Sequence, residues 1–307
     1  MGENWALGRL GAYANIWEPR LSAQTTTLDA QSSAISLIPT ASEMEARPPT
    51  GLDRRRWIKM EVVSVLEIND DVVGIQVSVP GGGKVELPVT SHIMIRGRDP
   101  QTSKNVVRSF TPIIPDQVEC PGIMYLVIKC YADGRMSRYI RTLREGGEIE
   151  IKGPVRSLKY FKGKYQRIVL IGGGSGITPL WQVAEAIIKD PEDETRICLI
   201  YQNRFEKDIL MRSELDEMAA QHPKKIRVLY MLSKPPEGWP GGKGRLDRAV
   251  LQSQLPPAEL PGSVIMICGP PGMIDSLAGP MDEETRVRDG GLLHQMGFSG
   301  EQIHVFE

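Results

Sequence analysis

Residues 167–179 read RIVLIGGGSGITP, and this stretch predicts a strand, a glycine loop and a helix in succession. The apolar run 168–171 is typical of a buried parallel strand. The four glycines that follow permit a sharp turn and let a phosphate approach the backbone N–H groups. We expect Thr178 to cap the next helix, with Pro179 at its first helical position. The pattern favours a nucleotide pyrophosphate site, and a tight turn that binds nothing is the alternative.

This loop differs from the common dinucleotide fingerprint G-x-G-x-x-G. Ile177 stands where the third glycine of that fingerprint falls. The next expected strand, 197–203, does not end in the Asp or Glu that would hold a ribose 2′-hydroxyl. The sequence therefore predicts a nucleotide loop of another lineage, or none.

Length and composition describe an ordinary globular protein of about two domains. The chain has 307 residues, of which 41% are hydrophobic and 24% charged, and its formal net charge is -1. The absence of bulk basicity argues against a nucleic-acid partner. No run of about 20 apolar residues predicts a membrane span.

The four cysteines, at positions 120, 130, 198 and 268, are scattered along the sequence. Because no C-x-x-C pair occurs, we expect no disulfide framework, zinc site or iron–sulfur cluster, and no metal ligands. This usage indicates a reducing compartment. Electron transfer in such a chain requires a bound organic cofactor.

Residues 1–54 are rich in Ala, Ser, Thr, Gln and Pro and show no sustained apolar period, which predicts a disordered tail or linker. No apolar core segment of a signal peptide occurs in it. Glu3, Glu18 and Asp29 argue against a mitochondrial presequence. We therefore expect a soluble protein in the cytoplasm.

The segment 55–164 predicts a small antiparallel β-barrel. Short strands alternate there with Gly, Pro and Asp, and a single helical segment is expected at 137–144. The expected strands are 58–68, 72–79, 92–97, 106–112, 124–131 and 148–153.

The segment 165–307 alternates strands with helices, which predicts a parallel sheet with ligands at the carboxyl ends of its strands. The helix 179–189 carries its apolar residues on one face. Further strands are expected at 197–201, 226–232 and 264–268, and further helices at 208–221 and 246–254. The glycine loop, 202–204, Ser233 and 268–272 all follow strands, so we expect them to meet at one edge.

Two segments of the barrel half have residues suited to a flat, phosphorylated ligand. Arg108-Ser109-Phe110-Thr111-Pro112 offers a guanidinium for phosphate, an aromatic ring for stacking and a hydroxyl for hydrogen bonding, although Phe110 in the barrel core is the alternative. Gly134-Arg135-Met136-Ser137 precedes a helical turn that Ser137 can cap, with its N-terminus toward an anion. The alternative is an ordinary capped turn.

Four motifs in order resemble a known family. RSFTP (108–112) matches R-x-Y-T-P, GRMS (134–137) matches G-K-M-S, GGGSGITP (172–179) matches G-G-T-G-I-T-P, and CGPPGM (268–273) matches C-G-P-P-P-M. EKDILMRSEL (206–215) is similar to the same group. Each motif is weak alone, but the ordered set is specific.

The chain thus resembles the NADH-cytochrome b5 reductase group of the ferredoxin-NADP reductase superfamily, which includes the flavin modules of nitrate reductases. The resemblance covers residues 57–306. It implies an antiparallel FAD-binding β-barrel followed by a parallel-sheet domain that binds NADH, NADPH or both. The implied FAD-binding residues are Arg108, Phe110, Thr111, Pro112, Gly134, Arg135, Met136 and Ser137. Lys129 and Tyr131 are implied to touch the cofactors.

Within that set the resemblance implies individual roles. Arg108 would bind FAD phosphate, Phe110 would lie along the isoalloxazine, and Thr111 would hydrogen-bond the ring and act in catalysis. Residues 134–137 would hold the FAD pyrophosphate. On the nucleotide side, Cys268 would lie near the nicotinamide as a catalytic residue. The remaining nucleotide-binding residues implied are Gly173, Gly174, Ser175, Gly176, Thr178, Arg204, Ser233, Gly269 and Pro270.

The sequence departs from the family pattern at several positions. Phe110 replaces the usual tyrosine, and Asp71 stands where a flavin-contacting threonine is common. Residues 90–92, Thr-Ser-His, replace a G-Q-H-like turn. The sequence ends Val305-Phe306-Glu307, one residue beyond the family's usual terminal aromatic, so Phe306 either shields the flavin or is displaced.

The leading hypothesis is a flavin-dependent reductase that takes a hydride from NAD(P)H onto FAD and passes single electrons to an external acceptor. A haem b5 protein or domain is the expected partner, because no H-P-G-G haem motif occurs in this chain. One alternative is the FAD/NAD(P)H module of a nitrate-reductase-like multidomain protein. A non-catalytic, flavoprotein-like binding scaffold is the other.

Overall fold

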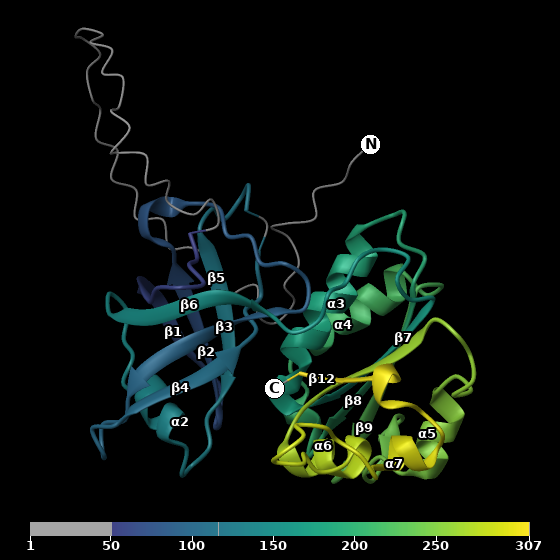
Figure 1. The fold of residues 1–307 in the computed structure, drawn as a ribbon. Helices are drawn as coiled ribbons and strands as arrows, with labels where there is room; N and C mark the ends of the chain where they lie inside the picture. Colours follow the sequence, from purple (N-terminus) through teal and green to yellow (C-terminus); the bar gives the residue numbers. More distant parts are fainter. Residues whose placement is uncertain (1–50, 116, 307) are drawn as a thin grey trace, which may run out of the picture.

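The computed structural model describes residues 51–115 and 117–306, which form two lobes, each built on one sheet (Figure 1). The predicted tail lies largely outside the described residues. Of its last residues, Leu52 is buried in the core of the first lobe. No helix among the described residues is long and apolar enough to cross a membrane.

The first lobe is a six-stranded antiparallel sheet in the order β4-β3-β6-β1-β2-β5. It is barrel-like, because an isolated bridge between Ile113 and Tyr125 joins the segment after one edge strand to the other edge strand. Its strands are β1 (Ile58–Asn69), β2 (Val72–Ser78), β3 (Ser91–Arg98), β4 (Asn105–Phe110), β5 (Ile123–Lys129) and β6 (Glu148–Arg156). Alternate side chains such as Ile93 and Ile95 fill the interior, as half-buried strands require.

The second lobe is a six-stranded parallel sheet in the order β10-β9-β8-β7-β11-β12. Its strands are β7 (Arg167–Gly173), β8 (Arg196–Asn203), β9 (Ile226–Leu232), β10 (Gly242–Lys243), β11 (Ser263–Cys268) and β12 (Ile303–Val305). Together the two sheets confirm the predicted fold class, an antiparallel barrel followed by a parallel α/β sheet.

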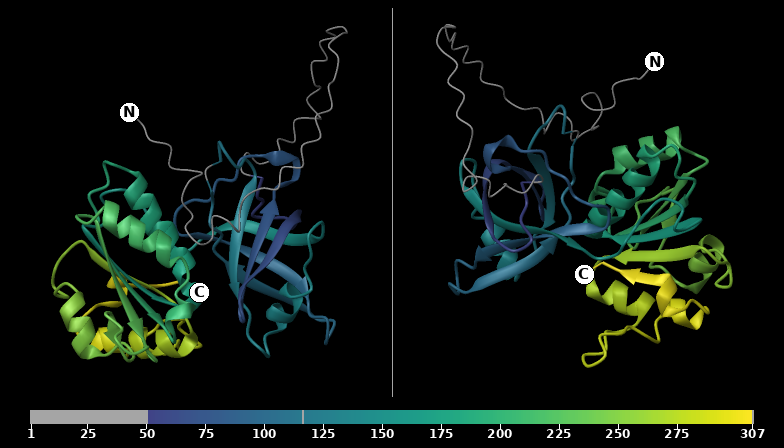
Figure 2. Two further views of the ribbon diagram at one scale, coloured as in Figure 1. Left: turned by 180° about the vertical axis from the view of Figure 1, so that it is seen from behind. Right: turned by 45° about the horizontal axis from the view of Figure 1, so that its top comes forward.

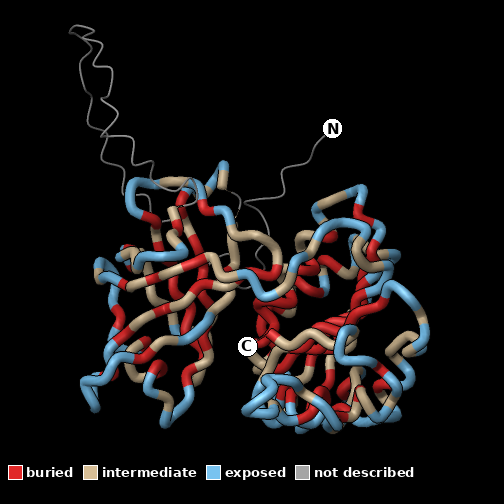
Figure 3. Tube along the Cα trace, viewed as in Figure 1, coloured by how far each residue is buried: buried red, intermediate tan, exposed pale blue. Residues whose placement is uncertain are grey.

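Helices cover both faces of the parallel sheet (Figures 1 and 2). One face carries α3 (Ile177–Lys189) and α4 (Arg212–Gln221), and the other carries α5 (Arg248–Gln254), α6 (Pro271–Ala278) and α7 (Leu292–Gln295). In β7, Ile168 packs toward the first face and Val169 toward the second. An apolar run without alternation suits a strand that is buried on both faces, and Figure 3 shows these central strands as buried.

Two expected helix starts were wrong. Thr178 does not cap α3, because a 3-10 turn, η2 (Gly174–Gly176), runs directly into the helix and makes Gly176 its N-cap. Ser137 does not cap the short helix α2 (Arg135–Ile140), whose N-cap is Gly134. The Ser137 hydroxyl instead accepts a hydrogen bond from the Tyr131 N–H at 2.9 Å, closing the turn before the helix.

The two lobes touch through polar and apolar contacts. Val72 of β2 is buried in the core of the second lobe. The Gln182 side chain, on α3, accepts from the Ser91 N–H at 3.2 Å and donates to the Ser91 carbonyl at 3.1 Å. These two bonds join α3 to the start of β3.

A buried ion pair fixes α2 to the barrel. Arg138 donates to both carboxylate oxygens of Asp99, at 2.8 and 2.7 Å, and Asp99 is fully buried. The Thr102 hydroxyl also donates to Asp99, at 2.7 Å. These contacts hold the pKa of Asp99 well below its usual range, and the hydrogen bonds from Arg138 contribute most to this lowering.

We therefore predict that Asp99→Asn lowers the thermal unfolding temperature at pH 7. The native carboxylate resists protonation, whereas the unfolded one takes up a proton near pH 4. The stability that Asp99 contributes is thus present above about pH 4 and is lost as the pH falls further, so the gap between variant and wild type narrows toward pH 3. Thermal unfolding at both pH values measures this gap. Asp133→Asn, an exposed acid just before α2, is the control, and a gap equal at pH 7 and pH 3 contradicts the prediction.

Candidate active site

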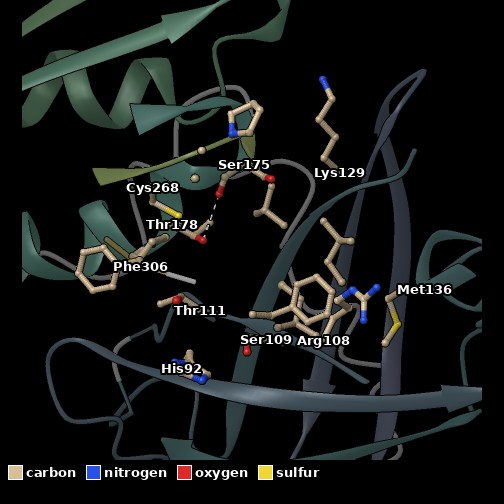
Figure 4. A pocket seen from close by; sticks show the side chains of 18 of the residues that line it. His92, Arg108, Ser109, Thr111, Lys129, Met136, Ser175, Thr178, Cys268 and Phe306 are labelled. Atoms are coloured by element: carbon tan, nitrogen blue, oxygen red, sulfur yellow. Dashed lines mark hydrogen bonds between the residues drawn. The ribbon is translucent and has the colours of Figure 1, made fainter. Parts of the chain in front are cut away.

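A cavity of about 500 Å³ lies between the barrel and the carboxyl ends of the parallel strands. The structure brings together 16 of the predicted site residues in its wall: Arg108, Phe110, Thr111, Lys129, Tyr131, Gly134, Arg135, Met136, Ser137, Gly173, Ser175, Gly176, Thr178, Cys268, Gly269 and Pro270. The other predicted residues, Pro112, Gly174, Arg204 and Ser233, do not line it. In Figure 4, Arg108 and Met136 lie on one side of the cavity and Cys268, Thr178 and Phe306 on the other.

The barrel contributes a cation, a ring and a hydroxyl at the end of β4. Arg108 is exposed, and the one hydrogen bond found for its side chain among the described residues runs to the neighbouring Val107 carbonyl, at 2.8 Å. The other donors of its guanidinium face no acceptor in the part of the chain that the structure describes, which suits a bound phosphate. Phe110 packs partly against the barrel core and also lines the cavity.

The turn before α2 approaches the cavity closely. A Cβ on Gly134 would lie 2.5 Å from the Ser137 hydroxyl oxygen, so only glycine fits there. Tyr131, just before this turn, is 56% exposed although it is aromatic. An exposed ring at the rim of a cavity is suited to stacking on a flat ligand.

The glycine loop and the end of β11 pack directly on each other. A Cβ on Gly176 would overlap the Cys268 carbonyl, and one on Gly173 would lie 2.8 Å from the Pro270 ring. Gly174 has a φ of 55°, in the left-handed region. These glycines are needed for packing inside the protein as well as for an approaching ligand.

Cys268 lies at the end of β11, beside Gly172 of the neighbouring strand. Burial raises the pKa of its thiol to about 12. The group therefore stays a neutral thiol at physiological pH. It can pack against a ligand or donate a weak hydrogen bond, but it does not act there as a thiolate.

The predicted set of site residues did not include ten residues that line the cavity, although the sequence had placed the 90–92 turn and Phe306 near the flavin: Thr90, Ser91, His92, Ser109, Leu126, Val127, Ile128, Ser157, Pro179 and Phe306. Of these, Thr90 has a φ of 65°, which is costly for a β-branched residue. Its hydroxyl donates to the Leu158 carbonyl. The departure from a G-Q-H-like turn was the available signal, because a glycine adopts this conformation freely.

Two polar side chains in this wall, Ser91 and His92, lie close to where a ligand would bind. The buried Ser91 hydroxyl has no hydrogen-bond partner among the described residues. Burial lowers the pKa of His92, whose ring lies 3.4 Å from the Ser157 hydroxyl, so the imidazole is neutral at pH 7. Phe306 closes the opposite end and is buried against the second lobe. Its ring and the His304 ring meet edge to face, with their centroids 4.8 Å apart.

A second group of predicted residues lies at the same sheet edge but outside the cavity. Ser233 donates its N–H to the Asn203 carbonyl at 3.0 Å, and Lys234 donates its N–H to the Arg204 carbonyl at 2.9 Å. The Arg204 guanidinium and the Lys234 ammonium lie 5.1 and 5.9 Å from the centroid of the exposed Phe205 ring. We call Arg204, Phe205 and Lys234 the cationic platform.

The residues present fit a flavin dinucleotide on the barrel side and a nicotinamide dinucleotide on the sheet side. The fit rests on the uncommitted Arg108 donors, the unpartnered Ser91 hydroxyl and the glycine cradle that a Cβ would fill. No group of three or more His, Cys, Asp or Glu side chains in the described ranges could hold a metal ion.

Comparisons with known proteins agree with this arrangement. Residues 59–160 match the oxidoreductase FAD-binding domain, and residues 170–278 match the oxidoreductase NAD-binding domain. NADH-cytochrome b5 reductase 2 of Aspergillus fumigatus is 33% identical over 252 residues, which cover 81% of this chain and 77% of that protein. The Emericella nidulans protein of the same name is 32% identical over 271 residues, 87% of this chain and 83% of its own length.

Among solved structures, the cytochrome b5 reductase domain of Ulva prolifera nitrate reductase matches with a TM-score of 0.71 and 28% identity. The match covers 83% of this chain and 99% of that domain. The CS-b5R domains of human Ncb5or match at 22% identity with a TM-score of 0.62, a likeness of fold alone.

We predict that Arg108→Ala yields a folded protein that purifies with much less FAD. A charge-assisted contact to phosphate is worth about 1.5–3 kcal/mol, so FAD affinity should fall roughly 10- to 100-fold. The ratio of flavin to protein absorbance and an FAD titration measure the loss. Arg98→Ala, at the exposed end of β3, removes an equal charge outside the cavity and should retain FAD. Full flavin content in Arg108→Ala rules out the assignment.

Proposed function

The chain belongs to the NADH-cytochrome b5 reductase family, and we propose that it oxidises NADH or NADPH through FAD and reduces a haem b5 protein. It is an NAD(P)H-dependent FAD oxidoreductase. The observation that carries the proposal is the single cavity in which the RSFTP and GRMS segments of the barrel face the glycine loop and Cys268 of the parallel sheet.

FAD, when bound, accepts the two electrons of a hydride and gives them up singly, which a one-electron haem acceptor requires. The protein's part is to hold two flat rings in contact. Hydride transfer needs reacting atoms about 3–3.5 Å apart, so a cavity closed by two separate lobes is suited to align them.

We propose that the barrel wall holds FAD. Arg108 and residues 134–137 bind its phosphates, Phe110 and Tyr131 lie along its rings, and Thr111 hydrogen-bonds the flavin edge. Support comes from the exposed Arg108 fork and the exposed Tyr131 ring. Lys129 lies between this wall and the glycine loop and is in reach of both cofactors.

We propose that the glycine loop and the end of β11 hold the nicotinamide nucleotide, with Cys268 beside its ring. A thiol whose pKa is about 12 contributes packing and shape there rather than proton transfer. The buried Phe306 excludes water from the same end of the cavity.

We also propose the module boundaries 55–164 and 165–307, supported by the two sheets and the matched ranges 59–160 and 170–278. A reducing, cytoplasmic location is supported by four free cysteines.

The proposed function predicts that the FAD-loaded protein loses its flavin absorbance when NADH or NADPH is added without oxygen. Addition of oxidised cytochrome b5 should then restore the flavin spectrum and produce the reduced haem bands. A nitrate-reductase-like module would show the same flavin reduction but pass electrons only to its own haem domain. A binding scaffold would take up no FAD or show no bleaching, and either result overturns the enzyme proposal.

The cationic platform supports use of NADPH beside NADH. The residue directly after β9 is Ser233, not an acid, and two exposed cations flank Phe205 close by. A unit charge at 4 Å is worth roughly 1 kcal/mol in water and about 4 near a protein surface. An acid at this position would therefore disfavour a 2′-phosphate enough to set the choice.

We predict that wild type accepts NADPH and that Ser233→Asp lowers its kcat/KM for NADPH about tenfold or more, with little change for NADH. Steady-state kinetics with both nucleotides tests this. Gln252→Glu adds the same charge on α5, outside the cavity, and should change neither value. If saturating NADPH does not reduce wild type at all, this role of Ser233 is wrong and the donor is NADH alone.

A further inference from the structure

The turn between β1 and β2 places two consecutive acids at the boundary of the lobes. Asp70 pairs with Lys207 of the second lobe at 3.1 Å, and Asp71 pairs with Lys129 at the end of β5 at 2.8 Å. The Asp71 N–H donates to the Asn69 side chain at 3.1 Å, and the Cys130 N–H donates to the Asp71 carbonyl at 2.6 Å. The backbone therefore fixes Asp71 beside Lys129.

Lys129 crosses the glycine loop on its way to Asp71. A Cβ on Gly174 would lie 3.9 Å from the Lys129 Cδ, in ordinary contact. In Figure 4 the Lys129 side chain rises beside Ser175, and its ammonium points away from Arg108 and Cys268. The aliphatic part of the Lys129 side chain thus lies over the glycine loop, while its ammonium pairs with Asp71 away from that loop.

The ion pair is weak enough to be exchanged. The side chains of Lys129 and Asp71 are 26% and 41% exposed, and pairs of this kind contribute little to stability. A pyrophosphate offers Lys129 more negative charge than one carboxylate. A pyrophosphate that reaches the loop at 174–176 therefore competes with Asp71 for the Lys129 ammonium.

We propose that Asp71 sets the affinity of the nicotinamide dinucleotide by competing with its pyrophosphate for Lys129. This inference rests on the proposed function. Asp71 holds the ammonium off the glycine loop in the free protein, and binding requires Lys129 to exchange one partner for the other. The consequence is weaker binding of the dinucleotide and faster release of its oxidised form. Asp71 is a positioning residue, because it acts through Lys129.

The test measures NAD⁺ binding to the FAD-loaded full-length protein by titration calorimetry, without turnover. Asp71→Asn keeps the backbone bonds and should tighten NAD⁺ about five- to tenfold. Asp70→Asn removes the same charge one residue away and should change the Kd less than twofold. In a Lys129→Met background, Asp71→Asn should have no effect. In turnover, Asp71→Asn should lower the KM for NADH by the same factor without raising kcat.

Unchanged or weaker NAD⁺ binding in Asp71→Asn overturns the inference. Equal tightening in Asp70→Asn, or persistence of the Asp71 effect with Met at position 129, also overturns it, since the cause is then general charge and not competition for Lys129. Absence of both NAD⁺ and NADP⁺ binding to wild type overturns the proposed function itself. That outcome is distinct, because it requires no comparison of variants.

Discussion

The contact between the glycine loop and the end of β11 is the constraint on which the site depends. Parallel pairing places Cys268 beside Gly172, so the turn that leaves β7 must cross directly over Cys268 and Gly269. A side chain at 176 would overlap the backbone there. The glycines therefore let two strand ends close on each other, and only then can the loop present its N–H groups to the cavity.

The two lobes are held by contacts of different kinds. Val72 of the barrel is buried in the core of the second lobe, and two hydrogen bonds join Gln182 to Ser91. The Asp70–Lys207 pair is largely exposed and adds little to stability. Apolar burial and the amide bridge thus hold the two lobes together, and the exposed ion pair adds little to that contact.

The elements predicted well from sequence are those with long, regular patterns. The run at 168–171 and the helix that follows correspond to β7 and α3. The short elements β10 and β12 have two and three residues, too few to show a period, and they form because neighbouring strands supply their partners. Both predicted caps failed for a local reason, since a 3-10 turn precedes α3 and the Ser137 hydroxyl serves the turn before α2.

Motifs located most of the cavity wall, because residues adjacent in sequence remain adjacent in the fold. They could not reveal that residues 90–92, Ser157 and Phe306 come from three separate segments to complete it. Nor could they show that Arg204 and Ser233, at the predicted sheet edge, do not line the cavity. These placements depend on strand order and on how the lobes meet, which local patterns do not encode.

The Gln182–Ser91 bridge has a consequence for building hybrids within this family. Gln182 lies on α3, the helix that begins at the glycine loop. Its bonds to Ser91 therefore connect the nucleotide site directly to the barrel. A chimera that joins this barrel to the parallel-sheet module of a relative would keep every cofactor motif. If that module lacks an amide at the Gln182 position, however, α3 loses its hydrogen bonds to the barrel, and they no longer help to fix the spacing between the flavin and nicotinamide rings. The positions equivalent to Ser91 and Gln182 therefore belong to the crossover design as much as the cofactor motifs do.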